Sequence, residues 1–377
     1  MYNNNATVTV LCHGTGSDQE NGYLKVRSLD KSHDELITLL GNHIVDGIDL
    51  GRYYNDPYYL YELSLPPSQR QPKDNYKYAN VETRGSEIID SHYKIVLNGP
   101  GATNRPPCKM NPQQLTASAE SLAQTSRTKA LLTGKGWENN VAYTCQLLQQ
   151  HFSPTAGTGQ TLKTINLVGW SRGAVTCNMI ANAIVKCFPQ VTINIFSVDP
   201  VVGGLTTTTQ AMVTLPHQVN FSQIILASHA QLPGFKPLYP QIMRFNPMTT
   251  KLAVDQFPGT HSTPVVRSKK ITSGTTLVAT VIFHMAKQFL SDHNSRLTAD
   301  ANQYIPDMSP QELLAYCNHI SASRAQDYLH IKRTHATLHS GSEFFTPYHS
   351  RIAAMAAAAE EKARIEACTV MPINRRA

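Results

Sequence analysis

Short runs rich in β-branched and aromatic residues recur along the first part of the chain. They stand at residues 6–12, 93–98, 164–168, 191–198 and 221–227. Such runs favour buried β-strands. Segments with apolar residues at helical spacing lie between them, at residues 137–151 and 174–185. Strands that alternate with helices predict an α/β fold of the α/β-hydrolase type, in which a mostly parallel sheet carries helices on both faces.

Other stretches interrupt this alternation. Residues 41–91 are rich in Tyr, Asn, Asp and Pro and show little periodicity, which predicts loops or an irregular insertion. A polar, proline-containing stretch at residues 102–133 predicts a second insertion. The expected α/β domain therefore spans residues 1–270 and includes both insertions.

The chain beyond residue 270 is expected to be helical. Residues 277–290 are apolar, residues 309–312 (S-P-Q-E) have the sequence of a capping box with proline at the first helical position, and residues 351–367 are rich in Ala and Glu. We interpret residues 271–377 as a helical C-terminal region that forms a cap or binds a partner.

Composition places the chain among globular proteins. Its 377 residues are 41% hydrophobic, which is enough for a large core. The best candidate for a membrane span, residues 277–286, is interrupted by Thr280 and by His284, which we expect to be a core histidine. The first residues have neither a basic region nor an apolar signal core. We therefore expect a cytoplasmic protein or one delivered by a specialised secretion system, and no transmembrane segment.

Cysteine usage and charge narrow the functional classes. Seven cysteines without C-x-x-C spacing suit reduced thiols better than a disulfide framework. The formal net charge of +7 favours anionic contacts such as a membrane surface. The basic residues are dispersed, however, and no nucleic-acid-binding motif is present. A solvated basic surface is therefore the main interpretation, peripheral contact with an anionic membrane stays open, and nucleic acid is not an expected partner.

The strongest chemical signal is the sequence G-W-S-R-G at residues 169–173, directly after a predicted strand and before a predicted helix. A sharp strand-to-helix turn exposes its central serine, and it requires small residues two positions before and after that serine. Both positions are glycine. The pattern predicts that Ser171 is the nucleophile of a serine hydrolase.

A serine nucleophile needs a histidine base and a carboxylate that orients it. Asp199 stands at the carboxyl end of the next predicted strand, where ligands bind in open α/β folds. Asp255, in an apparent loop, is the alternative acid. His261 lies in the loop F-P-G-T-H-S downstream of the acid and is the preferred base, with His229 as its competitor.

Negative charge on a tetrahedral intermediate needs preorganised donors. The residue after the nucleophile, Arg172, would supply one backbone N–H. The loop after the first strand would supply the other, through Gly14 or Thr15. A glycine turn without a ligand is the plain alternative for that loop. It does not fit a phosphate-binding motif.

Three histidines, His330, His335 and His339, have spacings that place two of them on one helical face. No carboxylate or cysteine completes a recognised metal site there. We interpret them as solvated side chains. The sequence predicts neither a metal ion nor another cofactor.

Taken in order, several motifs resemble those of the bacterial α/β-hydrolase family labelled as domain of unknown function 2235. That family includes the type VI secretion lipase effectors of the first class. The matching segments are H-G-T-G at residues 13–16, G-P-G at 99–101, the helix at 134–148, G-W-S-R-G-A at 169–174, I-F-S-V-D-P-V at 195–201, S-H-A at 228–230 and F-P-G-T-H-S at 257–262.

The resemblance covers roughly residues 6–265. It implies that Ser171 is the nucleophile, Asp199 the acid and His261 the base of a lipase or phospholipase-type esterase. The sequence departs from the motifs of this family at two places. These differences affect the expected oxyanion geometry and substrate pocket more than the three proposed catalytic residues. His13 replaces the usual opening aspartate, and T-P-V-V at residues 263–266 replaces D-V-G-G. A cytosolic esterase or thioesterase for small acyl substrates stays open, as does an inactive protein that binds a membrane or a partner.

Overall fold

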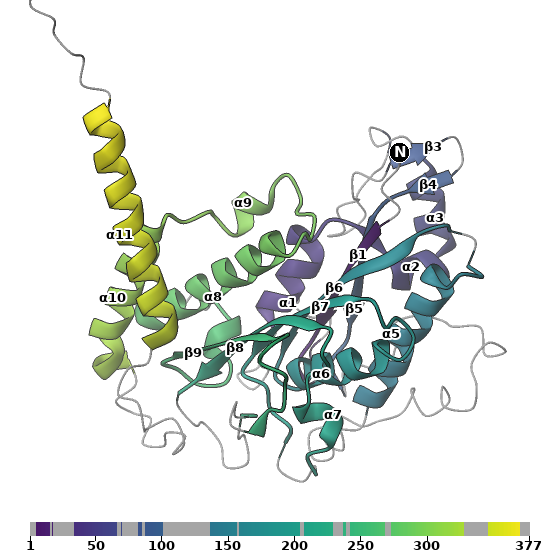
Figure 1. The fold of residues 1–377 in the computed structure, drawn as a ribbon, viewed down its shortest axis with the longest axis horizontal. Coiled ribbons are helices and arrows are strands. Elements are labelled where there is room, and N and C mark those ends of the chain that lie inside the picture. The colour runs from purple at the N-terminus through teal and green to yellow at the C-terminus, as the bar shows by residue number, and fades with distance from the viewer. Residues whose placement is uncertain are drawn as a thin grey trace, which may run out of the picture.

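The computed structural model describes residues 5–15, 17, 34–65, 69, 82–84, 87–100, 136–156, 158–203, 207–228, 237–238, 242–267, 273–327 and 346–369. Within them lies a seven-stranded sheet whose strand order is β2-β5-β1-β6-β7-β8-β9 (Figure 1). All six strand pairings are parallel. The α/β class predicted from the sequence is therefore confirmed.

The strands have the following bounds: β1 Asn5–Cys12, β2 Ile48–Asp49, β5 His92–Leu97, β6 Thr161–Trp170, β7 Thr192–Val198, β8 Val219–Ala227 and β9 Lys251–Phe257. A separate hairpin pairs β3 (Glu82–Arg84) with β4 (Glu87–Ile89). Five of the main strands were predicted. β2 and β9 were not, because two paired residues are too few to show a pattern, and the apolar residues of β9 are interrupted by Asp255 and Gln256.

Helices cover both faces of the sheet (Figure 1). One hydrophobic cluster joins the sheet to α2 (Leu50–Asn55), α3 (Pro57–Ser64), α5 (Trp137–Phe152), α6 (Arg172–Ile184) and α7 (Gln210–Val213). The other joins it to α1 (Glu35–Leu39), the π-helical turn η1 (Leu40–Ile44), α8 (Ser273–Asp292), α9 (Ala301–Tyr304), α10 (Pro310–Asp327) and α11 (Thr346–Thr369). Successive strand residues alternate between the clusters, as Leu167 and Val168 do, because side chains along a strand point to opposite faces.

The structure corrects the prediction for residues 41–91. This stretch holds η1, β2, α2, α3 and the β3–β4 hairpin among its described residues, so it is more regular than expected. Its helices are short and are fixed by N-caps, since Asp49 accepts from the N–H of Arg52 and Asp56 accepts from that of Tyr59. Elements of six to eight residues are too short for hydrophobic periodicity to reveal. The predicted insertion at residues 102–133 lies outside the described residues.

The helical character expected beyond residue 270 is confirmed for the described segments. The capping box is present: the Ser309 hydroxyl accepts from the N–H of Glu312 (3.2 Å), whose carboxylate accepts from the N–H of Ser309 (2.7 Å). α8 does not stand apart from the sheet, since Val278 and Ile282 are fully buried in the cluster that contains strand residues. His284 is buried on α8, as expected, and burial lowers its pKa.

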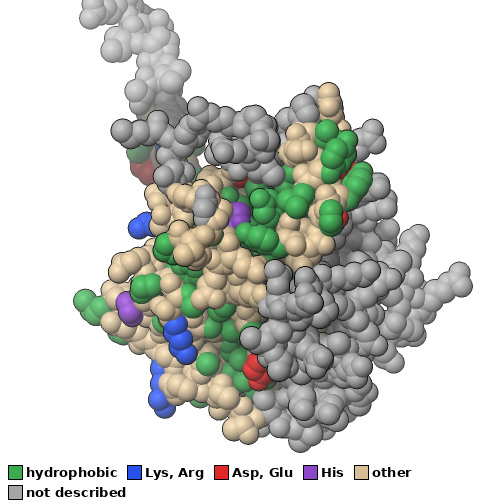
Figure 2. Space-filling model, turned by 90° about the vertical axis from the view of Figure 1, so that its right-hand side faces the viewer, with side chains coloured by type: hydrophobic (Ala, Val, Ile, Leu, Met, Phe, Trp, Pro, Cys, Tyr) green, Lys and Arg blue, Asp and Glu red, His purple; other side chains and the backbone are tan. Residues whose placement is uncertain are grey.

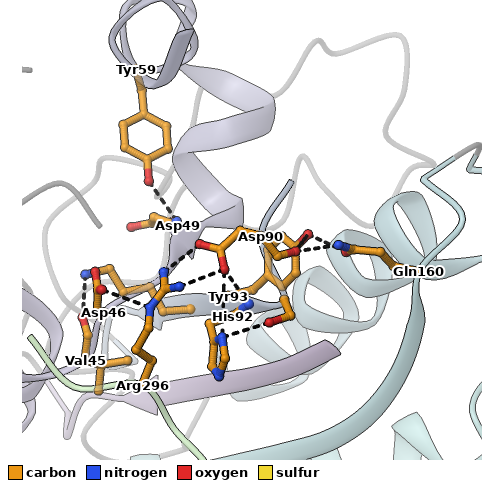
Figure 3. A network of polar contacts seen from close by, with 11 residues as sticks. Val45, Asp46, Asp49, Tyr59, Asp90, His92, Tyr93, Gln160 and Arg296 are labelled. Atoms are coloured by element: carbon orange, nitrogen blue, oxygen red, sulfur yellow. Dashed lines mark hydrogen bonds and ion pairs between the residues drawn. The ribbon is translucent and has the colours of Figure 1, made fainter. Parts of the chain in front are cut away.

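A polar network closes the amino ends of the strands (Figure 3). Arg296, from the segment after α8, donates to both carboxylate oxygens of Asp90 (3.1 and 2.6 Å) and forms an ion pair with Asp46 (2.9 Å). Tyr93 and Gln160 both donate to the carbonyl oxygen of Asp90. The network lies at the amino ends of the strands, opposite to their carboxyl ends. It therefore stabilises the fold away from the predicted site.

Among the described residues, two consecutive helices carry a group of exposed apolar side chains. α2 and α3 hold the exposed side chains of Tyr54, Tyr58, Leu60 and Tyr61. These helices lie at the right of Figure 1, and Figure 2, which views the molecule from that side, shows hydrophobic side chains gathered in its upper part. None of the described helices is both long enough and apolar enough to cross a bilayer.

Candidate active site

Ser171 occupies a strained turn between β6 and α6. Its φ of 57° and ψ of −123° are unfavourable for a residue with a side chain. The turn is held by the N–H of Ser171, which donates to Val198 (2.9 Å), and by the Ser171 carbonyl, which accepts from Val201 (3.3 Å). The predicted strand–serine–helix turn is therefore present.

The two flanking glycines are required by packing. A Cβ on Gly169 would lie 2.6 Å from the backbone of Gly173, and a Cβ on Gly173 would lie 2.1 Å from the carbonyl oxygen of Cys12. Both distances are below any that real Cβ atoms show. The sequence argument for two small residues thus has a direct steric basis, in which α6 approaches β1 and β6 at backbone contact.

Asp199 follows β7, the strand next to β6 in the sheet. Its φ of 41° is also in the left-handed region. The backbone N–H of Ala227 donates to one of its carboxylate oxygens (3.0 Å), and its own N–H donates to Ile225 (2.7 Å). β8 therefore holds the carboxylate of Asp199 at the carboxyl ends of the strands.

His261 lies beyond β9 and connects the two residues. Its Nδ1 is 2.6 Å from Oδ2 of Asp199, and its Nε2 is 2.8 Å from Oγ of Ser171. With Nδ1–H donating to the carboxylate, Nε2 accepts the serine O–H. The side chain is 14% exposed, against 2% for Asp199. The three residues thus form one continuous chain of hydrogen bonds.

The structure places the competing acid, Asp255, away from this chain of hydrogen bonds. Asp255 is not in a loop as predicted: it lies within β9, where its fully buried carboxylate accepts from Gln223 (2.8 Å) and pairs with Arg351 (2.9 Å). His229 lies outside the described residues. So do His330, His335 and His339, and the residues that are described contain no group of three or more His, Cys, Asp or Glu side chains able to hold a metal ion.

Trp170 was not singled out from the sequence, yet it contacts His261, the predicted base. Its ring stacks on the imidazole of His261, with 5.0 Å between centroids and 28° between planes. The indole N–H donates to the carbonyl oxygen of His261 (3.1 Å). Its position as the second residue of the turn motif is the one signal that could have pointed to this role.

The loop after β1 also lies at the carboxyl ends of the strands. Gly14 is packed under Trp170, since a Cβ on Gly14 would lie 2.3 Å from the indole ring. The Gly14 N–H donates to the carboxylate of Asp34 (3.1 Å). Of the two donors predicted in this loop, Gly14 is therefore engaged by Asp34, another residue that sequence reasoning missed.

Arg172 is 4% exposed and joins two loops around the site. Its guanidinium donates to the hydroxyl of Thr15 (3.3 Å) and to the carbonyl oxygen of Val202 (3.2 Å). Burial lowers its pKa from the ordinary value. A Cβ on Gly203 would meet the guanidinium at 2.1 Å, so the loop after Asp199 is fitted closely around this side chain.

No protein-family model and no curated protein matches the chain. Among solved structures it is similar to an uncharacterized protein from Pseudomonas aeruginosa, with 12% identity and a TM-score of 0.43 over 90% of this chain and 55% of that one. It is also similar to a protein named as a cell surface hydrolase from Lactobacillus plantarum WCFS1, with 12% identity and a TM-score of 0.37 over 81% and 98% of the two chains.

A third similar structure is the Tle1 effector bound to the VgrG spike from the Type 6 secretion system, with 12% identity and a TM-score of 0.34 over 69% of this chain and 50% of that one. The chain thus spans about half the length of this effector and of the Pseudomonas protein. Similarity at this level assigns the chain to no family, and its function is inferred from the geometry of its own residues.

Proposed function

We propose that the protein is a serine hydrolase that cleaves carboxylic esters, with Ser171 as nucleophile, His261 as general base and Asp199 as the orienting acid. One observation carries the proposal: the hydrogen-bond chain from Oγ of Ser171 through His261 to Asp199 starts at a strained turn. A structural serine needs neither the strain nor the imidazole.

The chemistry follows from the two ends of the imidazole. His261 accepts the Ser171 proton at Nε2 while the serine oxygen bonds to the ester carbonyl carbon. Nδ1–H stays bonded to Asp199, whose charge stabilises the imidazolium. The tetrahedral intermediate expels the alcohol, which takes the proton from Nε2. Water then releases the acid from the serine by the same proton route, and the enzyme returns to its starting state.

The developing oxyanion requires N–H donors. Arg172 is the first residue of α6, and backbone N–H groups in the first turn of a helix have no acceptor within that helix. Its N–H is the first proposed donor. The loop after β1, which the Arg172 side chain fastens through Thr15, supplies the second.

The substrate class rests on sequence. The resemblance to domain of unknown function 2235 favours a lipid ester, and the net charge of +7 suits transient contact with an anionic membrane surface. The same resemblance favours delivery by a specialised secretion system. Small acyl esters and thioesters are alternative substrates that the same three residues can cleave.

A fluorophosphonate probe tests the reaction class, because it phosphonylates an activated serine. We expect labelling of the wild type and its loss in Ser171→Ala. Ser228→Ala is the matched control: Ser228 is a buried serine at the end of β8 that donates to the carbonyl oxygen of Phe257 (2.6 Å), so its variant stays labelled.

Absence of labelling in folded wild-type protein overturns the proposal and favours an inactive protein that binds a membrane or a partner. If labelling is present, a panel of lipid classes and short acyl esters identifies the substrate. Phospholipid or glyceride turnover supports a lipase, whereas turnover of water-soluble esters alone favours the cytosolic esterase.

A further inference from the structure

We propose that Asp34 is the positioning residue of the oxyanion site: it binds the N–H of Gly14 and thereby assigns oxyanion binding to the N–H of Thr15. This inference rests on the proposed function. Asp34 is 1% exposed and stands 20 residues after Gly14, in the segment that leads into α1.

The backbone groups of the loop after β1 can be accounted for one at a time. The N–H of His13 donates to Leu97 (3.0 Å), and that of Gly14 donates to Oδ2 of Asp34 (3.1 Å). For the N–H of Thr15, no acceptor is found among the described residues. Of these three donors, Thr15 alone is left to meet a substrate oxygen.

The orientation of that N–H is also fixed. The carbonyl of Gly14 accepts from the N–H of Ser17 (3.0 Å). In a trans peptide the carbonyl and the following N–H point in opposite directions, so the N–H of Thr15 points away from Ser17. The hydroxyl of Thr15 is in turn held by Arg172, the residue after the nucleophile.

Asp34 divides its two carboxylate oxygens between the helix and the loop. Oδ1 accepts from the N–H of Ile37 (3.2 Å) and caps α1, whereas Oδ2 accepts from Gly14 and lies 3.3 Å from Nδ1 of His13. The side chains of Asp34 and His13 are both fully buried. One oxygen therefore stabilises a helix, and the other fixes the peptide next to the proposed donor.

The next residue holds the other side of the site. Glu35 accepts from the backbone N–H of Arg267 (2.7 Å) and from its guanidinium (2.9 Å). Arg267 follows η6 (Thr263–Val265), the turn that begins two residues after His261. Consecutive residues thus tie the start of α1 to the oxyanion loop and to the loop of the base, and Asp34 acts in a frame that fixes both.

Asp34→Ser separates its two contacts. A serine caps a helix almost as well as an aspartate but has only one side-chain oxygen. We expect the melting temperature to stay near that of the wild type. Turnover of a p-nitrophenyl ester and the rate of fluorophosphonate labelling should fall about 100-fold, the effect of losing one oxyanion donor, in kcat with KM unchanged. Asp34→Asn, whose single amide oxygen can still serve Gly14, should give an intermediate rate.

Asp56→Ser is the matched control, because Asp56 caps α3 through Tyr58 and Tyr59 and contacts none of the three proposed triad residues. It should label at the wild-type rate. If Asp34→Ser unfolds, Asp34→Asn carries the test. Wild-type rates in a folded Asp34 variant overturn this inference alone. Absence of labelling in the wild type overturns the proposed function, and this inference falls with it.

Discussion

The indole of Trp170 stacks on the imidazole of His261 and donates its N–H to the carbonyl oxygen of the same residue. Trp170 is also the immediate neighbour of Ser171 and covers Gly14. One buried ring therefore contacts the proposed base and the proposed oxyanion loop at once. It fixes the imidazole plane through stacking and the backbone of the base loop through a hydrogen bond.

Replacing Trp170 should slow the reaction in proportion to the contacts removed. Trp170→Phe keeps an aromatic face but loses the N–H donor, whereas Trp170→Leu loses both. A ring face over a forming imidazolium contributes about 0.5–2 kcal/mol. We expect kcat/KM to fall roughly ten-fold for Leu and less for Phe. Phe289→Leu, in the same hydrophobic cluster, should lower stability without changing kcat/KM. Equal losses in the Phe and Leu variants would contradict a role for stacking.

The proposed triad was predictable because each of its signals is local. Gly169 and Gly173 bracket Ser171, and Asp199 ends an apolar strand. The base required a choice between histidines in two loops. The hydrogen bonds of His261 now favour His261. Asp34 gave no such signal: an aspartate before a short helix has the sequence of any N-cap. Its contact with Gly14 depends on how two segments of the chain pack.

The same contrast explains why some strands were predicted from the sequence and others were missed. The Val- and Ile-rich strands were visible because burial on both faces demands continuous apolar runs. β9 is an edge strand whose buried Asp255 pairs with Arg351 on α11 and accepts from Gln223. Nothing near position 255 in the sequence announces a partner 96 residues away. Long-range pairing of this kind is what local patterns omit.

Asp199→Asn tests the acid. We expect the variant to fold, since an amide oxygen can still accept from Ala227, while kcat falls by about 10⁴ because the histidine loses its orienting partner. Steady-state ester hydrolysis measures this. Asp255→Asn is the control and should retain near-normal turnover. The reverse result would transfer the role of acid to Asp255.

For the base, inactivity of His229→Ala but not of His261→Ala would overturn the assignment.

Glu35→Gln tests whether the contact between Glu35 and Arg267 helps to position the proposed base, His261. The change keeps the size of the side chain but removes the charge that binds Arg267 at two points. Because η6 follows His261 closely, we expect a loss of about three- to ten-fold in kcat, with no change in KM. Glu361→Gln is a matched control: it breaks an exposed ion pair with Arg364 and should change neither activity nor stability measurably. Unchanged kcat in Glu35→Gln would show that the base loop is held by other contacts.

Arg351→Met should produce a stability defect that depends on pH. Burial raises the pKa of Asp255, and Arg351 opposes that rise. Without the guanidinium the pKa of the folded state rises further, so the ionised carboxylate becomes more costly to keep in β9. Removing one partner of a buried pair costs about 3–5 kcal/mol, and we expect roughly 2 kcal/mol here because Arg351 is partly exposed and Gln223 remains.

The sign of the pH dependence follows from the protons bound. Well below about pH 4 the carboxyl group of Asp255 is protonated in both folded and unfolded chains, so the electrostatic penalty of Arg351→Met vanishes. As the pH rises above that value, the unfolded chain ionises freely while the folded variant resists, and the difference in unfolding free energy from the wild type grows. Urea unfolding at several pH values measures this. The double variant Asp255→Asn/Arg351→Met should lose the dependence; a defect that is equal at all pH values would mean that Arg351 holds α11 by packing rather than by charge.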